Sequence, residues 1–137
     1  MADFMKFQAT VENLVNGVYD LDGDTLKIAL TNVAPNAATA SQLSHITQIA
    51  TAGGYTAGGL TVANTDVSRV GGTANLVGDN VEFTATGEMG PLRFAVLYDD
   101  TAADKPLLGY WDRGASVTLY ENDKFTVVFG AQILSLS

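Results

Sequence analysis

The sequence predicts a mainly β protein: an antiparallel β-sandwich of the jelly-roll kind, with a short N-terminal helix and a long loop containing a second short helix. Two observations predict this class. Short β-prone runs recur through the second half of the chain, and each is bounded by Gly, Asn, Asp or Pro. Because 137 residues suit one core, we expect residues 1–137 to form a single domain.

The composition is that of an acidic, globular chain. Apolar residues make up 47% of it, which is enough to form a core. Its net charge of -8 repels phosphate backbones and disfavours a nucleic-acid partner. The chain has no cysteine, no apolar run of membrane-spanning length and no signal-peptide pattern, so we expect neither thiolate chemistry nor a membrane partner.

The first element is a short amphipathic helix that Gly17 can end in a left-handed conformation. Its apolar residues fall at helical spacing: Phe7, Val11, Leu14, Val15 and Val18. Residues 20–24 then have turn chemistry, and residues 25–31 alternate as a first core strand.

Residues 32–59 lose the strand pattern and predict a long ordered loop. Leu43, Ile46 and Ile49 have the spacing of one or two helical turns, for which Thr39 or Ser41 is the expected N-cap.

Six further runs predict the remaining strands: 60–63, 81–86, 92–98, 116–120, 125–129 and 133–136. Val81, Phe83 and Ala85 alternate with polar residues, which predicts a strand with one wet face. Residues 94–98 are apolar on both faces and should form a central strand.

Three aspartates, Asp20, Asp22 and Asp24, lie at alternate positions from which carboxylates can converge on a calcium ion. A helix–loop–helix calcium site is excluded because its sixth position would be Thr25 instead of Gly and its twelfth Thr31 instead of Glu. We favour a turn with solvated carboxylates. An irregular cation site stays open as the alternative, and no metal or cofactor is expected elsewhere.

The glycine-rich stretch 53–59 has the glycine spacing of a phosphate-binding loop. Gly59 and Leu60 stand where that loop needs Lys and Ser or Thr, so we interpret the stretch as a glycine-assisted turn.

A hydrolase of the Ser-His-Asp kind would depend on His45, the only histidine. Ser41 and Ser44 are too near in sequence to be its partners, and no Gly-x-Ser-x-Gly motif occurs. We therefore expect a surface or loop-packing histidine and no enzyme.

An acidic turn, with Asp99, Asp100 and Asp104, follows the predicted central strand. Paired carboxyls can hydrolyse glycosides, but one of the pair must be desolvated. Since this cluster lies in a polar stretch, we expect a solvated hairpin connection.

Aromatic residues supply the interface candidates Tyr110, Trp111 and Tyr55. An exposed Tyr110–Trp111 pair can stack on a sugar or anchor a protein interface. A buried tryptophan beside a turn is the favoured interpretation, because Trp is highly buried on average.

The C-terminal half carries a resemblance. RFAVLYDD at 93–100, DKPLLGYWD at 104–112, VTL at 117–119 and FTVVF at 125–129 resemble a segment recurrent in small tailed-bacteriophage virion structural proteins. LKIAL at 26–30, ITQIA at 46–50 and GYTAGG at 54–59 are similar to the same family, so the resemblance covers most of the chain. These motifs look architectural and transfer no catalytic residue.

The resemblance implies a β-sandwich virion protein made in the host cytoplasm, and the acidic charge suits the outside of a DNA-filled shell. The leading hypothesis is a capsid decoration, or cement, protein whose partners are the major capsid protein and itself. Closed symmetry and the threefold positions of an icosahedral shell make a homotrimer the expected form. Two alternatives stay open: a tail or baseplate component, and a carbohydrate-binding module with Trp111, Tyr110 and Tyr120 as its stacking platform.

Overall fold

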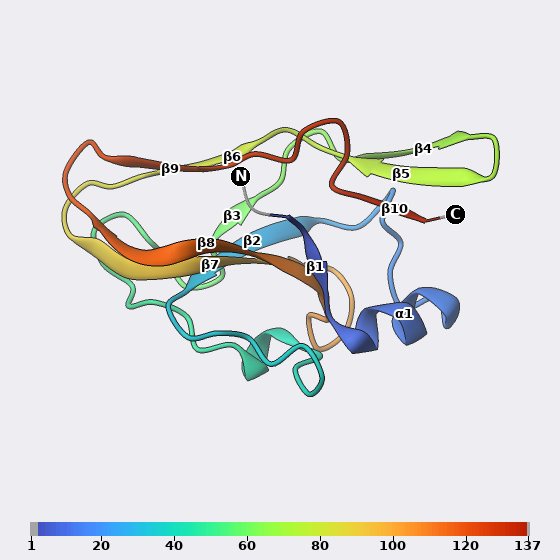
Figure 1. The fold of residues 1–137 in the computed structure, drawn as a ribbon, viewed down its shortest axis with the longest axis horizontal. Coiled ribbons are helices and arrows are strands. Elements are labelled where there is room, and N and C mark those ends of the chain that lie inside the picture. The colour runs from blue at the N-terminus through green and yellow to red at the C-terminus, as the bar shows by residue number, and fades with distance from the viewer. Residues whose placement is uncertain (1–2, 137) are drawn as a thin grey trace.

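A five-stranded antiparallel sheet is the centre of the computed structural model, which describes residues 3–136 (Figure 1). Its spatial order is β1 (Met5–Lys6), β8 (Leu107–Leu119), β7 (Met89–Asp99), β2 (Leu26–Thr31) and β3 (Leu60–Thr61). The long β7 and β8 form its central hairpin. All five residues of 94–98 are buried, which confirms that this run is a central strand.

Two smaller sheets form the second layer over one face of the large sheet (Figure 1). One has the order β10 (Leu134–Leu136), β5 (Thr73–Val77) and β4 (Asp66–Val70), and the other pairs β6 (Val81–Thr84) with β9 (Lys124–Val127). The main core lies between the layers and includes Ile28, Leu97, Trp111 and Phe83. The predicted mainly β sandwich with one short helix is thus confirmed.

The other face of the large sheet is covered by the N-terminal segment and by residues 37–46, on the side opposite the small sheets (Figure 1). Ile49 and Tyr55, later in the same loop, pack into the main core instead. Alternation explains how one strand serves both faces: Leu97 packs into the main core, whereas Val96 and Tyr98 pack into a second cluster with Phe7 and Ile46. A sheet buried on both faces needs such a run of apolar residues.

Two glycines let the covering loop approach the sheet. A Cβ on Gly59 would lie 1.7 Å from the carbonyl oxygen of Ile28, and one on Gly53 would lie 2.2 Å from that of Glu88. Both glycines also have positive φ. The stretch 53–59 is therefore a glycine-assisted turn, as expected.

The loop contains one short 3₁₀ turn, η1 (Leu43–His45). Its N-cap is Gln42, so the expectation of Thr39 or Ser41 was wrong. The backbone is already extended at Ile46, because that residue turns inward to the second cluster.

The N-terminal helix α1 (Gln8–Val15) is present, but its orientation differs from the one that its pattern predicts. Its buried residue is Thr10, whose hydroxyl donates a 2.7 Å hydrogen bond to the carbonyl oxygen of Leu108 in β8. This anchor turns Val11 and Val15 outward, where they are 54% and 84% exposed.

Sequence reasoning missed β1, β4, β5 and residues 107–115 of β8. β4 is mostly exposed and β5 is mostly half-buried, so neither shows the alternation of a strand with one buried face. None of the helices in the described part of the chain is long and apolar enough to cross a bilayer.

Candidate functional site

The aromatic interface candidates lie mainly inside the molecule. Trp111 is 3% exposed, with its ring packed between Phe4 and Phe129 at centroid distances of 4.9 and 5.4 Å. Tyr55 is 2% exposed, and only Tyr110 is half-buried. The interpretation of a core tryptophan is confirmed.

The sugar-stacking platform is therefore not assembled. Tyr120 is 60% exposed, but Trp111 has no free face to offer a sugar ring. Because Trp111 and Tyr55 are buried, a protein partner cannot contact their rings at the surface.

His45 lies exposed on η1. Its Nδ1 accepts a 3.1 Å hydrogen bond from the backbone N–H of Ser41, which is a loop-stabilising contact. No serine hydroxyl among residues 3–136 is hydrogen-bonded to it, so the surface histidine that we expected is found.

The aspartates of the 20–24 turn stabilise that turn. Asp20 Oδ1 accepts the N–H of Gly23, and Asp24 Oδ2 accepts the N–H of Asp20, both at 3.1 Å. Within residues 3–136, no three acidic or histidine side chains come together as a metal site. The three aspartates are not a convergent ligand set.

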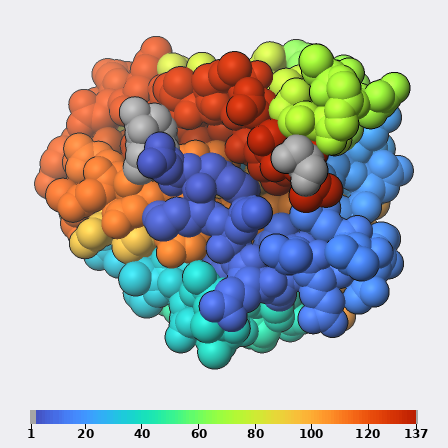
Figure 2. Space-filling view, turned by 45° about the vertical axis from the view of Figure 1, so that its right-hand side comes forward, coloured from blue at the N-terminus to red at the C-terminus, as the bar shows by residue number. Residues whose placement is uncertain are grey.

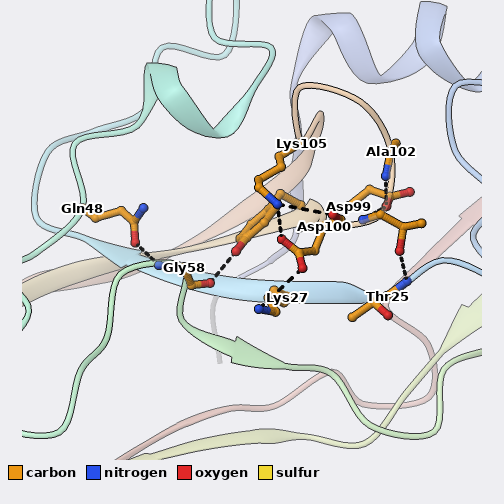
Figure 3. Close-up of polar contacts among 10 residues, drawn as sticks. Thr25, Lys27, Gln48, Gly58, Asp99, Asp100, Ala102 and Lys105 are labelled. Atoms are coloured by element: carbon orange, nitrogen blue, oxygen red, sulfur yellow. Dashed lines mark hydrogen bonds and ion pairs between the residues drawn. The ribbon is translucent and has the colours of Figure 1, made fainter.

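The acidic turn after β7 divides into two environments. Asp100 forms ion pairs with Lys105 at 2.6 Å and with Lys27 at 3.5 Å (Figure 3). The hydrogen bond from Lys105 is the main reason that the pKa of Asp100 lies below the ordinary value. Asp104 is exposed.

Asp99 is fully buried, so the expectation of an entirely solvated connection was wrong for this residue. Its side chain lies on the opposite side of the strand from that of Asp100. Burial, and then its contact with Asp24, raise the pKa of Asp99 to about 7.

A polar hollow of about 570 Å³ lies between η1 and the loop after β7. It is lined by Gln42, Ser44, Gln48, Asp100 and Lys105, among others. Asp100 and Lys105 are paired with each other, and Gln48 Oε1 accepts the N–H of Gly58 at 2.8 Å (Figure 3). Asp104, which also lines the hollow, is exposed to solvent. The hollow therefore has few free polar groups to recognise a small ligand.

An apolar groove lies between α1 and β10. It has a volume of about 230 Å³ and is lined by Lys6, Val11, Leu14, Val15 and Leu136. We call this feature the α1–β10 groove. Figure 2 shows the face on which the N-terminal helix and the C-terminal strand meet.

The groove continues into a smaller apolar recess under the edge of the β4–β5–β10 sheet. Leu14 and Leu136 line both, and Leu21, Val67 and Leu76 line the recess. Among residues 3–136, Lys6 is the only charged residue that lines either one. Contiguous exposed apolar surface of this kind is typical of protein-binding sites.

Sequence reasoning missed this groove because it placed the apolar side of α1 in the core. The available signal was the polar residue Thr10. When Thr10 contacts β8, Val11 and Val15 lie on the exposed side of the helix.

Comparisons with protein-family models, curated proteins and solved structures found no match to this chain.

Proposed function

We propose that this chain is a structural protein of a tailed-bacteriophage virion, and specifically a decoration protein of the capsid. The observation that supports the proposal most is the position in the fold of the segments that resemble phage virion proteins. The segments 93–100 and 104–112 build most of the central β7–β8 hairpin. Residues 26–30 form nearly all of the strand β2 beside it.

The side chains of these segments support a structural role. Leu97, Tyr98, Leu107 and Trp111 are all at most 3% exposed. A resemblance carried by core residues indicates a shared scaffold instead of a shared reaction.

The α1–β10 groove is the surface that we assign to capsid binding. Val11, Val15 and Leu136 are more than half exposed there, and exposed apolar side chains gain free energy when a partner removes them from water. The net charge of -8 favours a partner that surrounds its apolar contact with basic residues.

The occupant that we propose is an apolar side chain of the major capsid protein on the outer shell surface. A protein that binds only the assembled shell shifts the assembly equilibrium toward the shell by mass action. A homotrimer at the threefold positions would place three copies of the groove on one site of the shell.

Copy number in intact particles tests the proposal. Quantitative mass spectrometry on particles made by the genome that encodes the chain is expected to find on the order of hundreds of copies, as icosahedral symmetry requires. A few copies, with antibody labelling confined to the tail, would reject decoration in favour of a tail or baseplate component. Absence from particles would reject both.

A further inference from the structure

Two connections meet at one end of the large sheet, where β2 begins and β7 ends. Leu26 pairs with Asp99, and the N–H of Asp100 donates to the carbonyl oxygen of Thr25 at 2.8 Å. The N–H of Thr25 in turn donates to the Thr101 hydroxyl at 2.8 Å (Figure 3). The 20–24 turn is thereby held against the loop that follows β7.

The buried Asp99 carboxyl lies at this junction. Its Oδ1 accepts the backbone N–H groups of Thr101 and Ala102, at 2.9 and 3.0 Å. Its Oδ2 is buried and has no donor among residues 3–136. The backbone contacts of Thr25 bring the carboxyl of the preceding residue, Asp24, close to that of Asp99, and an ionised carboxyl can only accept a hydrogen bond.

Other groups near Asp99 do not supply the missing donor. Lys27 and Lys105 contact Asp100, whose side chain lies on the opposite side of the strand. The Tyr19 hydroxyl, from the segment after α1, donates to the carbonyl oxygen of Leu107. Two carboxyls without a third acidic or histidine side chain are a poor cage for calcium, which takes six to eight oxygens.

We propose that Asp24 and Asp99 share one proton, and that this proton fastens the 20–24 turn to the loop after β7. The proton resides on Asp99 Oδ2 and is donated to the Asp24 carboxylate. This arrangement gives the buried oxygen its partner and removes the repulsion between two adjacent carboxylates. Loss of the proton at higher pH loosens the turn.

The pKa directions agree with this geometry. The pKa of Asp99 is raised, first by burial and then by Asp24, whereas the pKa of Asp24 is lowered, first by its hydrogen bond with Asp99. Native Asp99 therefore keeps its proton to about pH 7, whereas an unfolded aspartate loses it near pH 4. The native state binds more protons between these values, so its stability falls as pH rises through this window.

The turn also connects to the second layer. The N–H of Val67 in β4 donates to Asp22 Oδ1 at 3.3 Å. Loosening of the turn is thus expected to reach the start of β4.

Carboxyl-carbon NMR of the wild-type protein tests the shared proton without any substitution. We expect Asp99 to titrate with a midpoint near 7 and Asp24 to titrate below the ordinary aspartate value. Amide exchange at Gly23 and Val67 should accelerate above that midpoint by more than the intrinsic pH effect. A midpoint for Asp99 near 4, the ordinary value, would overturn the proposal.

Thermal unfolding from about pH 5 to about pH 8 gives a second test. Asp99→Asn is expected to flatten the wild-type fall in Tm, because the Asn amide donates permanently to Asp24. Asp104→Asn removes an exposed carboxyl from the same loop and should keep the wild-type slope. All proteins compared, including the reference, carry His45→Gln, which removes the single histidine of the sequence. An unchanged slope in Asp99→Asn would overturn the proposal.

Discussion

Apolar side chains line both faces of the large sheet and also the α1–β10 groove. Other parts of the chain cover the two faces of the sheet, whereas the groove is open to solvent. Trp111 in β8 is 3% exposed, whereas Val15 in α1 is 84% exposed. The two elements are neighbours, because α1 packs against β8. The difference shows that apolar periodicity predicts where a helix lies in the sequence but not which side of the helix is buried. In α1 the buried side is the one that carries Thr10, whose hydroxyl is hydrogen-bonded to β8.

Covered apolar residues should therefore govern folding, and uncovered ones should govern binding. Substitutions in the core should thus cost more stability than substitutions in the groove.

Trp111→Ala should have the largest effect. It removes a ring that contacts Phe4 and Phe129 in the main core, and such truncations cost about 3–5 kcal/mol. Urea unfolding measures the loss. Tyr120→Ala, at a site that is 60% exposed, is the matched control and should change stability by less than about 1 kcal/mol.

Tyr55→Phe tests how the loop 32–59 is held against β2, because Tyr55 lies in the main core beside Phe83. The Tyr55 hydroxyl accepts the N–H of Leu30 at 3.1 Å and donates to Gln48 Oε1, so its removal leaves buried polar groups unpaired at a cost of about 1–3 kcal/mol. Tyr110→Phe is the control, because the Tyr110 hydroxyl makes no hydrogen bond within residues 3–136. Equal losses from the two variants would show that the loop is not held by this contact.

Asp100→Asn should have a small effect. Its ion pairs with Lys27 and Lys105 are partly solvated, and such pairs contribute less than about 1 kcal/mol. The loss should shrink further in high salt, because ions screen surface charges. A loss of several kcal/mol that persists in high salt would contradict this description of the loop.

Val15→Ser should have the smallest effect, within about 0.5 kcal/mol, because the side chain is 84% exposed. Val33→Ser, at a 57% exposed valine outside the groove, is the matched control. A large destabilisation by Val15→Ser alone would mean that the groove is part of the fold.

Much of the fold could be predicted from the sequence. Alternation of apolar residues located β2, β6 and the central part of β7, because burial on one face or both produces that pattern. The β4–β5 hairpin could not be found in this way, since four of the five β4 residues are exposed. Its turn, Gly71–Gly72, was the available signal.

The candidate sites were less predictable. Turn chemistry identified the 20–24 turn, but its sequence does not show that Asp24 lies against Asp99, more than seventy positions away. Nor does the sequence distinguish Asp99 from Asp100: only the side of β7 to which each points makes one buried and the other paired with lysine. Long-range packing determines both.

Binding to shells that lack the protein tests the central claim most directly. The purified wild type and a control carrying Val33→Ser with Val70→Ser, both at exposed valines outside the groove, should cosediment with shells to the same saturation. Val11→Ser combined with Val15→Ser, equally folded, should not bind. Equal binding by the control and the groove variant, or no binding by the wild type, would contradict the assignment of the α1–β10 groove to capsid docking.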